Sequence, residues 1–142
     1  MSEPKVLNFA ELKVGDSASF EIDLDVDFID KFANLSGDHN PLHTNESYAA
    51  ATSFGNRIPH GMIAGALFSR LVGMELPGKY ALYIGQTLSF RKPLPAPGRV
   101  CVSGLITNCS GATRTIRIAT VVQHAETKMI LVEGEALVRV LK

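Results

Sequence analysis

The hydrophobic period of the chain changes at residue 25. Residues 14–24 alternate apolar and polar positions, which is typical of a strand with one buried face. The alternating apolar residues are Ala18, Phe20 and Ile22. From Asp25 onward the apolar positions recur three and four residues apart, so we expect a helix that ends at Gly37. Those positions are Val26, Phe28, Ile29, Phe32 and Leu35. A second, shorter helix is predicted for residues 45–51, with Asn45 as its N-cap.

A nearly uncharged stretch in the middle of the chain predicts a buried helix. Residues 61–74, within "HGMIAGALFSRLVGMELPG", contain one charged side chain, Arg70. A helix that is apolar on nearly every face is buried on every face, and roughly 16 residues would extend roughly 24 Å through the protein. Pro77 and Gly78 end this helix, and its glycines and alanines let a sheet approach the backbone.

The rest of the chain consists of strand-like segments separated by turn signals. These segments are residues 80–90, 99–109, 113–124 and 128–140. The fold class is therefore α+β, with an antiparallel β-sheet wrapped around a long central apolar α-helix in a single domain, residues 1–142. Such a sheet exposes an edge, and because exposed edges are usually paired or covered, we expect the chain to dimerise.

Composition excludes several classes of partner. The 142 residues carry 14 basic and 14 acidic side chains, so no overall charge points to nucleic acid or to an anionic membrane. The N-terminus shows neither a signal-peptide nor a transit-peptide pattern, and the longest apolar run is too short to span a bilayer. The two cysteines form no CxxC motif and are expected to be reduced. These features predict a cytoplasmic protein.

The segment "LSGDHNPLHTN", residues 35–45, gathers a carboxylate, an amide and two imidazoles. These are Asp38, Asn40, His39 and His43. His39 and His43 have the spacing of zinc ligands only on a helix, and Pro41 and Gly37 argue against a helix there. A simpler interpretation is a polar turn stabilised by Asp38 and Asn40, with both histidines at the surface.

A third interpretation uses the residues that open the buried helix. The first N–H groups of a helix have no intrahelical partner, and Gly61 lets a ligand atom reach them without a side chain in the way. They would stabilise a carbonyl oxygen that becomes negative. Asp38 and His43 would hold a water and move a proton to or from the neighbouring carbon. This arrangement suits the addition or removal of water next to a thioester carbonyl, although the residues alone do not single it out.

Three stretches also match a known family. They are "SGDHNPLH", "FGNRIPHGMIAGALFSRLVG" and "LPGKYALYIGQTLSFRKPLPAPGRV". Together they resemble the MaoC-like hot-dog dehydratases, most closely the (R)-specific enoyl-CoA hydratases and 3-hydroxyacyl-thioester dehydratases, over roughly residues 12–140. The resemblance implies a hot-dog fold, a homodimer, and reversible syn addition of water to a trans-2-enoyl thioester. It implies no metal and no cofactor, because the thioester itself is the electron sink.

The resemblance also assigns roles to single residues. It implies that Asp38 is the catalytic carboxylate, His43 the catalytic imidazole, and Asn40 a residue that orients the site. Gly61 would bind the thioester oxygen through its N–H. Ser69 matches a serine implicated in some members, and a packing role is equally compatible with its position. His60 is expected to support the loop, and His39 to be exposed.

Substrate contacts follow from the same comparison. Candidate walls of an acyl tunnel are Tyr48, Phe54, Met62, Leu67, Phe68 and Leu71, each of which is also a good core residue. Arg57, Arg91 and Lys92 would meet the phosphates of a CoA or carrier-protein arm, or lie solvated at the surface. Two rival functions share the fold: a hot-dog acyl-CoA thioesterase and a non-catalytic subunit that binds acyl thioesters. A metal-dependent hydrolase is the most distant alternative.

Overall fold

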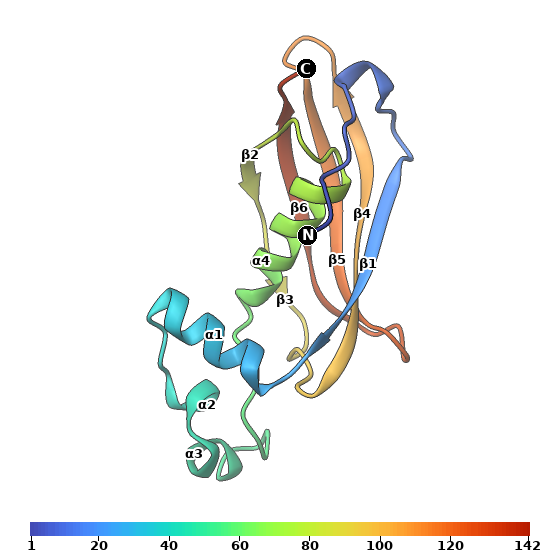
Figure 1. Cartoon of the computed structure of the whole chain (residues 1–142). Coiled ribbons are helices and arrows are strands. Elements are labelled where there is room, and N and C mark those ends of the chain that lie inside the picture. The colour runs from blue at the N-terminus through green and yellow to red at the C-terminus, as the bar shows by residue number, and fades with distance from the viewer.

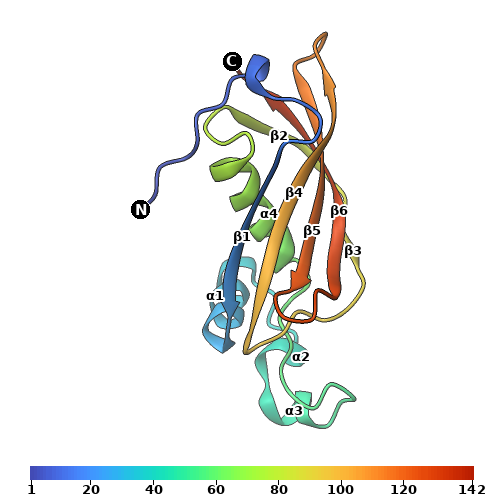
Figure 2. The ribbon, with the colours of Figure 1, turned by 90° about the vertical axis from the view of Figure 1, so that its right-hand side faces the viewer.

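The structure, a computed structural model, describes all 142 residues. A six-stranded antiparallel sheet in the order β1-β4-β5-β6-β2 curves around one central helix, α4, and β3 pairs with β6 beside β2 (Figure 1, Figure 2). The strands are β1 (Ser17–Leu24), β2 (Ala81–Gln86), β3 (Ser89–Phe90), β4 (Gly98–Ser110), β5 (Thr115–His124) and β6 (Ile130–Val140). The predicted α+β class and the sheet around a helix are confirmed.

Two of the predicted strands differ from the structure by more than two residues at one end or in their division. The first begins at Ser17 and not at residue 14, because Gly15 has a positive φ of 97° and turns the chain. Residues 80–90 divide into β2 and β3, because the pairing with β6 ends at Gln86 and resumes only at Ser89. The sheet therefore has free edges at β1 and at β2–β3, as the edge argument expects.

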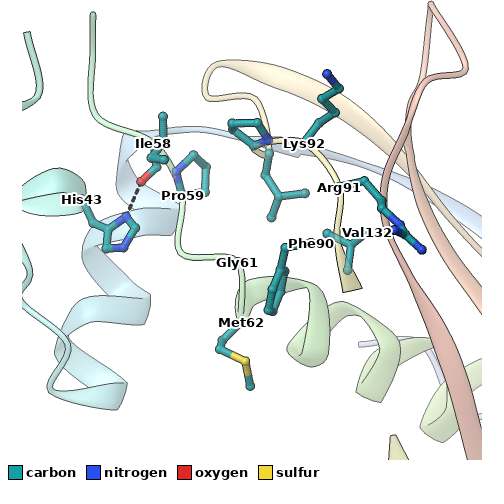
Figure 3. A pocket seen from close by; sticks show the side chains of 11 residues that line it. His43, Ile58, Pro59, Gly61, Met62, Phe90, Arg91, Lys92 and Val132 are labelled. Atoms are coloured by element: carbon teal, nitrogen blue, oxygen red, sulfur yellow. Dashed lines mark hydrogen bonds between the residues drawn. The ribbon is translucent and has the colours of Figure 1, made fainter. Parts of the chain in front are cut away.

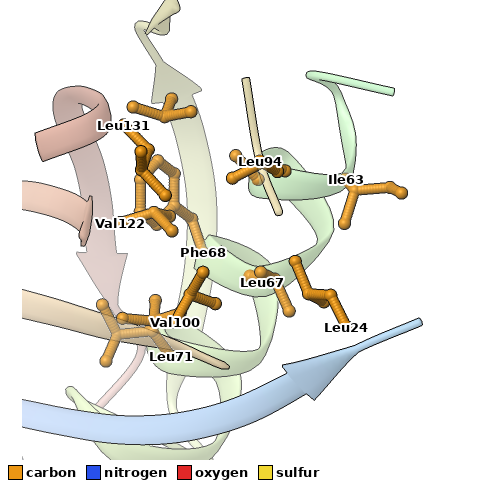
Figure 4. Packing of buried hydrophobic residues seen from close by; sticks show 12 residues of the cluster. Leu24, Ile63, Leu67, Phe68, Leu71, Leu94, Val100, Val122 and Leu131 are labelled. Atoms are coloured by element: carbon orange, nitrogen blue, oxygen red, sulfur yellow. The ribbon is translucent and has the colours of Figure 1, made fainter. Parts of the chain in front are cut away.

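The central helix packs against the concave face of the sheet. It consists of α4 (Ile63–Arg70), which continues as a π-helix, η2 (Leu71–Glu75). Ile63, Leu67, Phe68 and Leu71 are buried against strand residues such as Val100 and Val122 (Figure 4). A second buried cluster around Val72, Ile116, Ile118 and Val138 fills the other end of the sheet.

The expectation that this helix is buried on every face was wrong. Ala66, Ser69 and Arg70 are exposed, and Met62 just before the helix is 55% exposed. The sheet curves around one side of the helix only, so the small residues on the other side face outward in the single chain. None of the helices is both long and apolar enough to cross a membrane.

Three short helices gather at one end of the sheet, away from the C-terminus (Figure 1). They are α1 (Val26–Ser36), α2 (Pro41–Thr44) and α3 (Glu46–Ala50), and a 3₁₀ turn, η1 (Phe9–Glu11), precedes β1. The predicted N-cap at Asn45 and the predicted stop at Gly37 are confirmed: the side chain of Asn45 accepts a hydrogen bond from the N–H of Tyr48, and Gly37 at the end of α1 has a φ of 78°. The side chain of Asp25 caps the start of α1, where it accepts from the N–H of Phe28. Leu35, expected on the apolar face of α1, is instead 86% exposed.

Candidate active site

His43 lies on a helical turn that the sequence argument had rejected. Asn40 is the N-cap of α2, with an extended ψ of 131°, and its side chain accepts a hydrogen bond from the N–H of Leu42 at 3.0 Å. Pro41 occupies the first helical position, where a missing N–H costs nothing. Pro41 thus keeps Asn40 out of the helix, as expected, yet starts a helix that carries His43 and leaves His39 outside it.

The imidazole of His43 is fixed by one hydrogen bond. Its Nδ1 lies 2.7 Å from the carbonyl oxygen of Ile58 (Figure 3). A carbonyl only accepts, so Nδ1 carries the proton and Nε2 of the neutral ring keeps a free lone pair. The half-buried His43 is therefore held in the tautomer that can take a proton from a water or a substrate.

Asp38 sits in the loop between α1 and α2. Its N–H donates to Ser36 Oγ at 3.1 Å, and its Oδ1 accepts from the N–H of Asn40 at 3.1 Å. The carboxylate is half exposed, so water and substrate can reach it. The short-range bonds on both sides of Asp38 hold its carboxylate on the side of the loop that faces the histidines.

His60 connects Asp38 and His43. It is buried, its Nε2 donates to the backbone carbonyl of Asp38 at 2.9 Å, and its ring stacks on that of His43 with centroids 4.0 Å apart. Its Nδ1 has no hydrogen-bond partner in the chain. The expected supporting role of His60 agrees with this position, and His39 is exposed as predicted.

Asp38, His43 and His60 are also the side chains that come closest to a metal site. One donor atom of each lies within 4.8 Å of the others, and His39 is not among them. Nε2 of His60 donates to a carbonyl and is protonated, which leaves its buried Nδ1 as the ring nitrogen with a free lone pair. Two groups that share one water can lie up to about 5.6 Å apart, twice a usual hydrogen-bond length. Asp38 and His43 are therefore close enough to hold a bound water between them.

Gly61 and Met62 lie directly before α4. Neither backbone N–H donates a hydrogen bond within the chain, whereas the carbonyls of His60 and Gly61 accept the bonds that open the helix. These two N–H groups lie at the positive end of the helix dipole of α4, which continues through η2 to Glu75. They can stabilise an oxygen that gains negative charge.

A pocket of about 370 Å³ connects the imidazole with this helix terminus (Figure 3). Its lining residues are His43, Ile58, Pro59, Gly61, Met62, Phe90, Arg91, Lys92, Pro93, Leu94 and Val132. Five of the predicted site residues line this pocket: His43, Gly61, Met62, Arg91 and Lys92. Phe90 and Val132 are among the lining residues that the sequence analysis missed, because no local pattern marks strand residues that face a pocket.

Other predicted residues lie outside this pocket. Asp38 and Asn40 stand beside it, and Ser69 is exposed further along α4. Tyr48 and Phe54, predicted as tunnel walls, are about half exposed and do not line it. Leu67, Phe68 and Leu71 are core residues packed under the sheet. Among the predicted walls, Met62 is the one that the structure brings to the pocket.

Arg57 also differs from its prediction. Only 9% of its side chain is exposed, and its guanidinium group donates to Asp30 and to the backbone carbonyl of His43. These partners occupy the group that was expected to meet a phosphate. Arg91 forms an ion pair with Glu133 at 3.0 Å, whereas Lys92 forms no ion pair. Lys92 is therefore the cation at the pocket that stays free for an anionic ligand.

Known proteins resemble this chain in both sequence and structure. Residues 10–128 match the family model for the MaoC like domain. The chain is 36% identical to 3-hydroxybutyryl-CoA dehydratase from Methylorubrum extorquens, over 100% of this chain and 89% of the relative. It is 39% identical to (R)-specific enoyl-CoA hydratase from Aeromonas caviae, over 90% of this chain and 95% of the relative. Among solved structures, unliganded R-hydratase PhaJ1 from Pseudomonas aeruginosa superposes with a TM-score of 0.93 at 34% identity, covering 99% of this chain and 90% of that protein.

Proposed function

Because this chain belongs to the MaoC-like domain family and has the hot-dog fold of its R-hydratase neighbours, we propose that it is an (R)-specific enoyl-CoA hydratase and 3-hydroxyacyl-CoA dehydratase. It is a hydro-lyase that adds water reversibly to a trans-2-enoyl-CoA. One observation carries the assignment of the site: the imidazole of His43, with a free Nε2 and the Asp38 carboxylate close by, lines the same pocket as Gly61, whose N–H is unpaired.

The proposed reaction uses one water held between Asp38 and His43. The water oxygen bonds to C3 of the enoyl group as one of its protons passes to this pair. The electrons of the double bond move onto the thioester carbonyl oxygen, which the N–H of Gly61 stabilises. The pair then returns a proton to C2, so that one H and one OH have been added. Because the same pair takes and gives the proton, both additions occur on one face of the substrate, which makes the addition syn.

Asn40 acts in this proposal through α2, which it caps, and not through the substrate. We propose no metal and no redox cofactor, since the thioester accepts the electrons. Metal analysis of the purified protein, and activity after dialysis against EDTA, test this point. Activity that returns only with added metal would contradict it.

We also propose a cytoplasmic homodimer built on one hot-dog unit per chain. The free sheet edge at β2 supports the dimer, because Leu82 and Ile84 on this strand are about half exposed beside unpaired backbone groups. Light scattering of the purified protein measures the mass directly. A monomer at micromolar concentration would overturn the dimer proposal and leave the reaction untouched.

The test of the function is hydration of crotonyl-CoA, followed by loss of the enoyl absorbance. Asp38→Asn and His43→Gln each remove a group that carries protons, so each should lower the rate on the order of 100-fold or more. Chiral analysis of the product should show the (R)-3-hydroxy thioester. Release of free CoA without hydration would identify a thioesterase, and binding without either reaction would identify a non-catalytic subunit.

A further inference from the structure

Arg57 is a cation with almost no contact with solvent. Only 9% of its side chain is exposed. A buried guanidinium group is stable only where its charge and its donors are paired. Its Nη2 donates to Oδ1 of Asp30 on α1, and its Nε donates to the backbone carbonyl of His43 at 2.5 Å. Both contacts join segments that are remote in the sequence and close to the catalytic imidazole.

Ile58, the residue after Arg57, hydrogen-bonds to the side chain of His43. The Ile58 carbonyl accepts from Nδ1 of the imidazole at 2.7 Å, and its N–H donates to the Leu42 carbonyl at 3.4 Å. Arg57 and Ile58 therefore hold both the backbone and the side chain of His43. A shift of this dipeptide would move the imidazole and would also release the bond that fixes its tautomer.

The helix that carries His43 has little stability of its own. With four residues, α2 is a single turn, and such a turn is held by its surroundings. Asp30, in contrast, lies on the eleven-residue α1, which buries Ile29 and Ala33 in the fold. The ion pair of Arg57 with Asp30 thus connects Arg57 and Ile58, which hydrogen-bond to His43, with α1, which is packed into the fold.

We propose that Arg57, held by Asp30, is a positioning residue that orients the imidazole of His43 for proton transfer. It touches no reacting atom and acts through the backbone of His43 and through Ile58. The effect on the rate rests on the proposed function, because it assumes that His43 carries the proton. The effect on the tautomer of His43 does not.

The test compares four variants of the full chain. Arg57→Met removes the hydrogen bonds and the charge, Arg57→Lys keeps the charge, and Asp30→Asn removes the charged partner at a half-exposed position. Arg99→Met is the control, since Arg99 forms an ion pair with Asp23, through two hydrogen bonds of 2.9 and 3.0 Å, on the exposed surface away from the site. For each variant we would measure kcat and KM with crotonyl-CoA, the thermal midpoint, and the ¹⁵N shifts of the histidine ring nitrogens.

The proposal expects kcat to fall about 10- to 100-fold in Arg57→Met, with KM changed less than about threefold, because misplaced reacting groups slow the chemical step. Asp30→Asn should show a smaller loss of the same kind, Arg57→Lys a partial recovery, and Arg99→Met no change. The ¹⁵N spectrum should show His43 protonated at Nδ1 in the wild type and a mixture of tautomers in Arg57→Met.

Three results would overturn the proposal. One is an unchanged kcat in folded Arg57→Met. The second is an unchanged His43 tautomer in both Arg57→Met and Asp30→Asn. The third is a rise in KM at constant kcat, which would restore the phosphate-binding role. If Arg57→Met does not fold, kcat and the ¹⁵N spectrum of Asp30→Asn decide whether the proposal holds. If wild type does not hydrate crotonyl-CoA, the proposed function fails, while the ¹⁵N spectrum still tests the positioning of His43.

Discussion

The ring of Phe90 lies directly against Gly61. A Cβ added to Gly61 would come within 2.8 Å of Cδ1 of this ring, closer than real side chains pack. Phe90 is on β3, and Gly61 precedes α4, so this contact closes the pocket between sheet and helix (Figure 3). The glycine thus allows two things at once: an aromatic wall beside the substrate and an unobstructed N–H.

Gly61→Ala should therefore damage catalysis more than stability. The half-exposed Phe90 ring can move to make room, but it then changes the shape of the pocket around the thioester. Because a small displacement of a reacting group has a large kinetic cost, we expect kcat/KM for crotonyl-CoA to fall about 10- to 100-fold. Steady-state kinetics and thermal unfolding of the same preparation measure both effects.

Gly65→Ala is the control on the same helix. A Cβ there would meet its nearest neighbour, Leu88 Cδ1, at an ordinary 3.8 Å. Alanine inside a helix is about 0.5–1 kcal/mol more favourable than glycine, so this variant should be as stable as wild type or more so, with full activity. Equal kinetic losses in the two variants would show that the Phe90 contact is not the cause.

Asn40→Ala should lower both stability and activity. The side chain of Asn40 caps α2, and the loss of an N-cap costs typically about 1 kcal/mol. Because α2 carries His43, the frayed turn should also reduce kcat, by roughly tenfold, whereas Asn40→Ser should keep most of both. Urea unfolding measures the free energy of unfolding, and hydration kinetics measure kcat.

A second asparagine separates the two effects. Asn45 caps α3 in the same way, accepting a bond from Tyr48 at 2.8 Å, but α3 carries none of the catalytic residues. Asn45→Ala should therefore cost similar stability and leave kcat within about twofold. If Asn45→Ala slows the reaction as much as Asn40→Ala, the loss reflects general destabilisation.

Tyr83 should make the protein sensitive to strongly alkaline conditions. Burial raises the pKa of its phenol from 10.0 to about 12, and its hydroxyl donates to Gln86 at 2.5 Å. The folded protein thus binds this proton more tightly than the unfolded chain. The stabilising contribution is complete below about pH 10 and is lost as the pH rises through 12. Unfolding free energy should fall less steeply over this range in Tyr83→Phe than in wild type. Parallel curves would contradict the raised pKa.

The sequence predicted the elements that carry local signals. Gly37 and Asn45 mark the ends of helices through their own backbone and side-chain bonds, so their roles could be recognised without a structure. The division of residues 80–90 depends on an interruption of the pairing with β6 between Gln86 and Ser89. That is a relationship between distant strands, and no local pattern reveals it.

The same distinction holds for the site. Asp38, Asn40 and His43 are neighbours in the chain, and a short motif marks them together. The ion pair of Arg57 with Asp30 joins residues 27 positions apart, so the sequence could not tell this buried cation from the exposed ones. Phe90 reaches the pocket because β3 crosses the start of α4, which is a property of the fold.

Lys92 is the residue through which the CoA arm of the substrate can be tested. It lines the pocket without an ion pair, whereas its neighbour Arg91 is paired with Glu133. A partly exposed ion pair contributes about 0.2–1 kcal/mol, so Lys92→Ala should raise KM for crotonyl-CoA about 1.5- to 5-fold with little change in kcat. The increase should shrink at high salt, because salt screens the phosphate charge.

A substrate without phosphates provides the control for this prediction. The N-acetylcysteamine thioester of crotonate has the same reacting group and lacks the phosphates of CoA, so Lys92→Ala should not change its KM. Arg91→Ala should affect crotonyl-CoA less than Lys92→Ala does, because Glu133 already offsets the charge of Arg91. If Lys92→Ala raises KM for both thioesters equally, then Lys92 acts by shaping the pocket and not by binding a phosphate.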